Sequence, residues 1–244
     1  MARIEEIAPR IYQISTYSEQ FDLHFNQYLI LDEEPMLYHT GMRGIFPGVR
    51  DAMKTVMDPA KLRWIASSHF EADECGALNH WLAIASNAEP MASLVCANVS
   101  LNDFADRSAR ALGDGETFST GQFQWQFLST PEVPHAWDAG HLFEQTQRTM
   151  LCGDIFTQEN KRQALVEDDI VGPSRDMIVR YESTPFKGGF VYAPWTDATM
   201  ERLANLNPTT LATMHGSAFR GDGAKQLREM AAVWREVLGA KAQM

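Results

Sequence analysis

The sequence predicts an α/β fold in which two β-sheets pack on each other and helices cover their outer faces, giving a four-layer αββα sandwich. Three observations support this prediction. β-favouring runs occur in both halves of the chain, helical patterns lie between and after them, and polar residues follow several strands directly. The length of 244 residues suits one compact domain, so we expect residues 1–244 to form a single domain.

The first half opens with two predicted strands that pair with each other. Residues 11–17 alternate between apolar and polar side chains, and residues 26–31 form a β-favouring run that ends at acidic turn residues. Residues 62–68 predict another strand, which a polar loop separates from the helical pattern of residues 77–84. In α/β proteins, functional residues commonly lie in the loop between a strand and the helix that follows it.

The middle and second half continue this alternation. Residues 94–97 predict a strand, and residues 101–112 predict a helix. Residues 118–128 alternate in part, as expected for strands with one solvated face. Short strands at residues 149–152 and 210–214 each lead into a polar residue.

The remaining segments predict helices and one irregular region. Residues 157–190 are the least regular part of the chain, and they are suited to a lid or an interface element, with a helix at residues 175–181. A further helix opens near Thr196, which is a suitable N-cap residue, and an amphipathic helix covers residues 224–238.

Composition and charge exclude several classes of partner. The formal charge is −11, from 32 acidic and 21 basic residues, so the average surface repels nucleic acid and anionic lipid headgroups. The first six residues are charged rather than apolar, and no run approaches the roughly 18 apolar residues that a membrane span needs. The three cysteines Cys75, Cys96 and Cys152 form no C-x-x-C pair. We therefore expect a cytoplasmic protein without nucleic-acid or membrane partners.

Metal-competent side chains stand at every second position directly after the strand at residues 62–68. These are His69, Glu71 and Asp73, and in an extended loop side chains two apart project to the same side. Such a cluster alone is a modest signal.

Three distant residues strengthen it, because each is a strong ligand type that we expect at the end of an apolar strand. His135 follows a proline-rich turn, Asp154 follows residues 149–152, and His215 follows residues 210–214. The sequence thus predicts that one edge of the sandwich gathers six metal ligands.

The order H-x-E-x-D, a later His, an Asp behind a strand and a late His before Gly resembles the metallo-β-lactamase superfamily over nearly the whole chain. Hydrolases of that superfamily usually carry a second His where this chain has Glu71. The pattern with Glu is similar to that of flavodi-iron proteins and of related oxygen-binding di-iron proteins. The resemblance implies the metallo-β-lactamase form of the αββα sandwich.

The same resemblance implies how six residues share two metal ions. His69, Glu71 and His135 would bind one ion, Asp73 and His215 the other, and Asp154 would bridge them. Nitrogen and hard oxygen ligands without thiolate suit iron, which we expect as an Fe-Fe pair, while manganese or zinc stays open. Flavodi-iron proteins continue into a flavodoxin domain that binds FMN; the chain ends near its last predicted helix, so we expect it to bind no FMN.

Three further positions carry expectations of their own. Glu74 stands where the superfamily commonly has His, and it could bind the second metal, accept a hydrogen bond from a ligand imidazole, or face solvent at a helix N-terminus. His24 falls near a pocket histidine of the di-iron branch. Trp137 is a candidate for the pocket wall.

The leading hypothesis is a non-haem di-iron protein that binds O2 or NO, as an oxygen sensor or carrier or as a reductase supplied by a separate redox partner. A third possibility is a non-catalytic module that signals oxygen to a partner protein, and a homodimer stays open. The alternative is a dinuclear metallohydrolase acting on an ester, thioester or phosphodiester, in which Asp73 orients a bridging hydroxide. Metal identity discriminates between the two.

Overall fold

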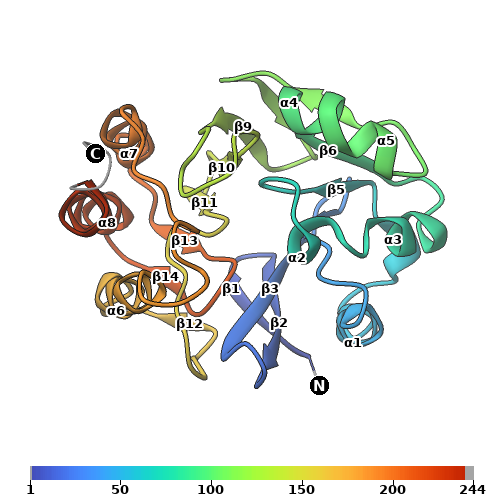
Figure 1. Cartoon of the computed structure of the whole chain (residues 1–244). Coiled ribbons are helices and arrows are strands. Elements are labelled where there is room, and N and C mark those ends of the chain that lie inside the picture. The colour runs from blue at the N-terminus through green and yellow to red at the C-terminus, as the bar shows by residue number, and fades with distance from the viewer. Residues whose placement is uncertain (1, 240–244) are drawn as a thin grey trace.

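The computed structural model describes residues 2–239, in which two seven-stranded sheets pack face to face between outer helices (Figure 1). The first sheet has the order β1-β2-β3-β4-β5-β6-β7. Its strands are β1 (Arg3–Ala8), β2 (Ile11–Ser18), β3 (Leu23–Ile30), β4 (Met36–Tyr38), β5 (Trp64–Ala66), β6 (Glu89–Ser93) and β7 (Arg110–Leu112). Strands β1 to β4 pair antiparallel, and β4 to β7 pair parallel.

The second sheet comes from the second half of the chain and has the order β12-β14-β13-β11-β10-β9-β8. Its strands are β8 (Thr117–Ser119), β9 (Gln124–Ser129), β10 (Gly140–Glu144), β11 (Thr149–Leu151), β12 (Leu165–Val166), β13 (Thr210–Ala212) and β14 (Ala218–Arg220). Strands β11 and β13 are parallel neighbours, although about sixty residues of chain separate them in the sequence. This pairing brings the carboxyl ends of two distant strands to the same edge.

Helices form the two outer layers. On the first sheet lie α1 (Phe46–Met53), the 3-10 turn η1 (Pro59–Lys61), α2 (Ala72–Cys75), α3 (Leu78–Ile84), α4 (Leu94–Cys96), the π-helical η2 (Ala97–Leu101) and α5 (Asn102–Phe104). The second sheet is covered by α6 (Val171–Tyr181), α7 (Thr196–Ala204) and α8 (Gly223–Val237), which lie together on the opposite side in Figure 1. The expected order of layers is therefore confirmed.

Apolar side chains fill the space between the sheets because strands of both sheets turn alternate residues inward. Trp125 and Phe127 of β9 and Tyr28 of β3 are completely or almost completely buried in this central cluster. Separate clusters join each sheet to its own helices. The predicted strands at residues 11–17 and 26–31 are confirmed as the antiparallel pair β2 and β3.

Strand β3 also ties the first sheet to the loop that follows β13. Its Asn26 is fully buried, and its side-chain nitrogen donates hydrogen bonds to the carbonyls of Thr213 and Gly216 at 2.9 Å each. Buried polar groups need such partners. The loop between Thr213 and Gly216 is thereby held against the edge of the first sheet.

Two expectations in the middle of the chain were wrong. The apolar run at residues 94–97 begins a helix rather than a strand, because the Ser93 hydroxyl accepts a hydrogen bond from the Cys96 amide and caps α4. The strand precedes it as β6. Residues 101–112 are not one helix: α5 ends at Phe104, and residues 110–112 form the edge strand β7.

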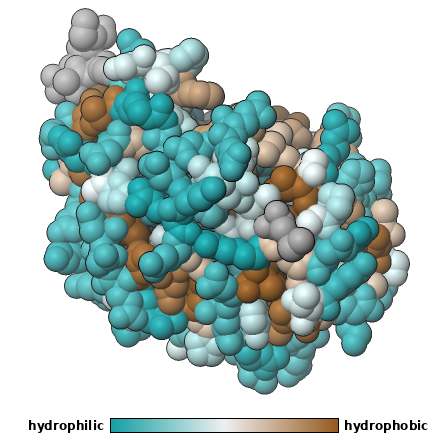
Figure 2. All heavy atoms as spheres, turned by 90° about the horizontal axis from the view of Figure 1, so that it is seen from below, coloured by the Kyte–Doolittle hydropathy of each residue, from teal (hydrophilic) through white to brown (hydrophobic). Residues whose placement is uncertain are grey.

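The surface of the protein is mainly polar on the face that Figure 2 shows. Hydrophobic residues lie there in small groups between polar ones. Among residues 2–239, no helix has both the length and the apolar character needed to cross a bilayer. All three cysteines are buried and unpaired.

Candidate metal centre

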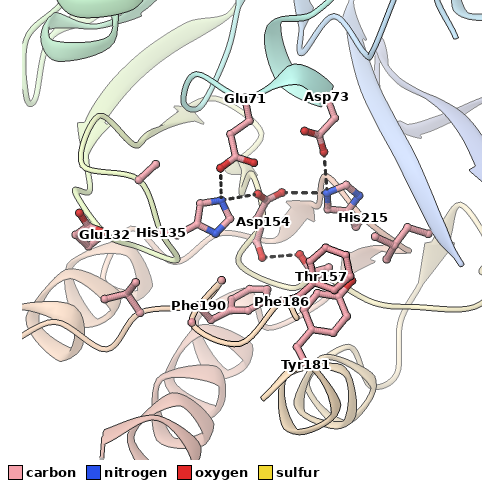
Figure 3. A pocket seen from close by; sticks show the side chains of 15 residues that line it. Glu71, Asp73, Glu132, His135, Asp154, Thr157, Tyr181, Phe186, Phe190 and His215 are labelled. Carbon is pink, nitrogen blue, oxygen red and sulfur yellow. Dashed lines mark hydrogen bonds and ion pairs between the residues drawn. The ribbon is translucent and has the colours of Figure 1, made fainter. Parts of the chain in front are cut away.

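Four chain segments bring the six predicted ligands to one edge of the sandwich, as Figure 3 shows for five of them. Strand β5 leads into His69 and Glu71, and the backbone of Glu71 is extended. Asp73 differs from expectation, because it lies in the first turn of α2 rather than in an extended loop. Its side chain still reaches the site, where Asp73 Oδ2 lies 3.4 Å from His215 Nε2.

The second sheet supplies the other three ligands. Asp154 and His215 follow the parallel neighbours β11 and β13, and each adjoins a glycine with positive φ, Gly153 at +49° and Gly216 at +106°. A side chain at Gly216 would place its Cβ 2.6 Å from Gln158 Cβ, so glycine allows the close turn there. His135 comes from the loop between β9 and β10.

Three ligands converge on one side of Asp154. His135 Nε2 lies 3.2 Å from Asp154 Oδ2 and 3.2 Å from His69 Nε2, and Glu71 Oε1 lies 3.6 Å from His135 Nε2. Donor atoms of His69, His135 and Asp154 all lie within 4.8 Å of one another, which is compatible with one shared cation.

On the other side, the second carboxylate oxygen of Asp154 faces a second group. Asp154 Oδ1 lies 3.4 Å from His215 Nε2, the same nitrogen that Asp73 approaches. The two oxygens of Asp154 therefore point to two different sets of donors (Figure 3). Two metal ions held by these two sets would share Asp154 as a ligand.

Hydrogen bonds fix the direction of two ligand imidazoles. His69 Nδ1 donates to the Ser68 hydroxyl at 2.9 Å, and that hydroxyl lies 3.0 Å from His39 Nε2. His215 Nδ1 donates to the backbone carbonyl of His24 at 2.7 Å. Because Nδ1 is occupied in both rings, Nε2 is the nitrogen that faces the site.

The electrostatics of the site show strong mutual stabilisation of opposite charges. Burial disfavours the ionised form of Asp154, but the hydrogen bond from His135 and the charges of His215 and His69 outweigh burial and lower its pKa. Burial likewise lowers the pKa values of His135 and His215. Their carboxylate partners outweigh it and raise both pKa values to about 9. In the metal-free protein these imidazolium groups neutralise part of the charge that cations would otherwise balance.

The residues present fit a pair of metal ions. Asp154 Oδ1 and both carboxylate oxygens of Glu74 are buried without a hydrogen-bond partner. A buried polar atom without a partner is costly, and a cation within coordination distance would satisfy it. Among the described residues, no cysteine sulfur belongs to the three groups of potential metal ligands. The donor set therefore consists of imidazole nitrogens and carboxylate oxygens.

A cavity of about 490 Å³ opens onto these ligands. Five of its lining residues are predicted ligands and lie together on one side in Figure 3: Glu71, Asp73, His135, Asp154 and His215. The opposite wall is aromatic: Tyr181, Phe186 and Phe190 line it, and the Phe190 ring centroid lies 6.0 Å from that of His135. This wall belongs to the region 157–190, which the sequence suggested as a lid or interface.

Two predicted pocket residues lie elsewhere. The His24 ring is not part of the cavity lining, because its Nδ1 donates to the Ser15 hydroxyl and its Nε2 accepts from the Arg162 amide. Only the His24 backbone reaches a ligand. Trp137 is 61% exposed and is also absent from the lining.

Sequence reasoning missed His39 and Ser68. His39 is completely buried, has φ of +64° and accepts from the Ser68 hydroxyl while its Nδ1 faces Met214 Sδ at 2.9 Å. Its contact with Ser68 spans 29 residues of sequence. No local pattern marks such a contact, although the position of Ser68 directly before His69 was a usable signal.

The chain was compared with known proteins. A sequence model of the family described as ODP family beta lactamase matches residues 23–216. The chain is 24% identical to the rubredoxin-oxygen oxidoreductase of Megalodesulfovibrio gigas over 81% of this chain and 49% of that protein. It is 23% identical to the nitric oxide reductase of Moorella thermoacetica over 89% of this chain and 55% of that protein. The chain thus spans about half the length of these curated relatives.

Among solved structures, a mutant form of the flavo di-iron protein from Thermotoga maritima superposes with a TM-score of 0.81 and 20% identity. The superposition covers 95% of this chain and 61% of that chain. The expected metallo-β-lactamase fold is confirmed.

Proposed function

We propose a function for this chain from its family, which is the one described as ODP family beta lactamase and to which the chain belongs. We propose that the chain is a non-haem di-iron protein that binds O2 or NO at a carboxylate-bridged site. It acts either as a sensor or carrier or as a reductase that takes electrons from a separate redox partner. The orientation of Asp154 is the observation that carries this proposal, since its two oxygens face two separate donor groups.

The chemistry of the ligands supports iron. Imidazoles and carboxylates without thiolate suit iron and manganese at least as well as zinc. Glu71 supplies a negative charge where the hydrolases of the superfamily have a neutral imidazole, and more negative charge favours a pair of ions that reaches higher oxidation states. When bound, the iron pair supplies one-electron redox chemistry and open coordination positions.

The protein's own groups position the ligands and shape the cavity. Ser68 and the His24 carbonyl hold the imidazoles of His69 and His215 with Nε2 toward the centre. Phe190 and Phe186 make the facing wall apolar, which suits a small, weakly polar molecule such as O2 or NO. The names of the two curated relatives, an oxygen oxidoreductase and a nitric oxide reductase, agree with these two ligands.

Anaerobic reconstitution with Fe²⁺ tests the proposal. We expect two iron ions for each chain and a change in the visible spectrum when O2 or NO is admitted. Steady O2 consumption with an added reductant would identify a reductase, and a stoichiometric, reversible change would identify a sensor or carrier. Two tightly bound zinc ions in protein from its native host, with turnover of simple esters and no response to O2 by the iron-loaded protein, would refute the proposal in favour of a hydrolase.

A further inference from the structure

Glu74 is a fully buried acid whose carboxylate accepts no hydrogen bond. Its exposed fraction is 0%, and the charged groups nearest to Oε1 and Oε2 are other residues of the predicted metal site. The backbone of Glu74 is fixed, because its carbonyl accepts hydrogen bonds from the Thr40 amide at 2.6 Å and the Thr40 hydroxyl at 2.9 Å. The structure therefore excludes the expectation that Glu74 faces solvent at the start of α2.

The carboxylate lies between the two groups of predicted ligands. Glu74 Oε2 is 3.8 Å from His69 Nε2, and donor atoms of His69, Glu71 and Glu74 lie within 4.8 Å of one another. Donor atoms of Asp73, Glu74 and His215 satisfy the same limit. Glu74 is thus the residue that these two donor groups share.

A buried carboxylate in this position is unfavourable unless a cation accompanies it. Glu74 is completely buried, and the negative charges of Asp73 and Asp154 repel its carboxylate. No arginine or lysine is among the partners that the structure gives its carboxylate. A divalent ion between these acids would reverse the repulsion and satisfy the two unpaired oxygens.

We propose that Glu74 is a seventh protein ligand of the dinuclear site, coordinating the metal ion held by Asp73 and His215. This inference rests on the proposed dinuclear function and makes it more specific. The site would contain the four carboxylates of Glu71, Asp73, Glu74 and Asp154, whose formal charge balances two divalent ions without a further anion. Such an oxygen-rich set favours hard ions, iron or manganese, over zinc.

Metal titration of Glu74→Gln tests the proposal. The amide has the same shape as the acid but no charge. We therefore expect one tightly bound Mn²⁺ ion and a second Mn²⁺ ion that binds about 10- to 100-fold more weakly than it does in the wild-type protein. Glu144→Gln is the matched control, because Glu144 is equally buried but accepts hydrogen bonds from Thr146 and Gln147. The control should bind two ions with wild-type affinity.

Two further measurements separate ligation from a structural role. In the Co²⁺-loaded protein, loss of an oxygen ligand lowers the coordination number of one ion, so Glu74→Gln should strengthen the visible absorption of cobalt. Glu74→Ala removes the carboxylate altogether, and added formate should restore binding of the second Mn²⁺. The metal-free Glu74→Gln protein should unfold close to the wild-type temperature, because the amide keeps the shape of the acid and removes its repulsion from Asp73 and Asp154.

The outcomes distinguish the two proposals. Wild-type affinity for both ions in Glu74→Gln, with an unchanged cobalt spectrum and no formate effect in Glu74→Ala, would show that Glu74 is a buried neutral acid. In that case the dinuclear site would stand and only the seventh ligand would be rejected. Failure of the wild-type protein to bind a second ion would instead reject the dinuclear site itself.

Discussion

Binding of metal should release protons, because His135 and His215 carry protons in the metal-free protein at neutral pH. Both imidazoles have pKa values raised to about 9, after burial is outweighed by Asp154 and, for His215, by Asp73. A protonated Nε2 cannot donate to a metal, so each imidazole must lose its proton first. At pH 7 we therefore expect the binding of two ions to release roughly two imidazole protons.

The size of the effect follows from the distance between pH 7 and these pKa values. Two pH units correspond to about 2.7 kcal/mol for each imidazole, at about 1.36 kcal/mol per unit. Apparent affinity for each ion should therefore rise about 50-fold between pH 7 and pH 9 and level off above about pH 10 at about 100 times its value at pH 7. The stability of the metal-free protein changes with pH in the opposite direction. The raised pKa values stabilise the metal-free fold fully below about pH 6.5, and this stabilisation disappears as the pH rises through about 9.

Calorimetric titration with Mn²⁺ measures the protons directly. At pH 7 the observed heat should differ between two buffers of unequal ionisation enthalpy in proportion to the protons released, and the difference should vanish near pH 10. The melting temperature of the metal-free protein should fall between pH 6.5 and pH 9. Equal heats in both buffers at pH 7, together with an affinity that does not change up to pH 9, would refute the assignment of protonated imidazoles.

Three substitutions test other parts of the structure. Asp154→Asn should reduce bound metal to less than one ion for each folded chain, because both donor groups lose their shared carboxylate; retention of two ions by elemental analysis would contradict the bridging role. Ser68→Ala should weaken metal binding about 10- to 100-fold by releasing His69 Nδ1, whereas Ser174→Ala, which removes a buried hydroxyl without a hydrogen bond, should not. Trp81→Ala should lower the free energy of unfolding by about 3–5 kcal/mol in urea titrations, since Trp81 is fully buried against the first sheet; a loss below 1 kcal/mol would argue against the described packing.

Much of the fold was predictable because its signals are local. The period-2 pattern of residues 11–17 and the amphipathic pattern of residues 224–238 each depend on neighbours along the chain, and β2 and α8 confirm them. The prediction of a strand at residues 94–97 was wrong because the local pattern there is too short to decide between a strand and a helix. A short apolar run fits a strand or a helix equally well, and the Ser93 cap decided the outcome.

Part of the candidate site could also be predicted from the sequence. The sequence shows the identity and order of the six predicted ligands, and their chemistry indicates two ions bound by nitrogen and oxygen. The role of Glu74 was open at that level. Its three interpretations differ only in what surrounds the carboxylate.

The sequence by itself therefore determined which atoms can bind metal and which strands deliver them, because those properties belong to single residues and to their near neighbours. Only the tertiary structure decided how these atoms face one another. The parallel pairing of β11 with β13, the anchoring of the Glu74 carbonyl by Thr40 and the contact between His39 and Ser68 join residues that are distant in sequence. Burial and electrostatic interaction depend on those distances in space, and no local pattern encodes them.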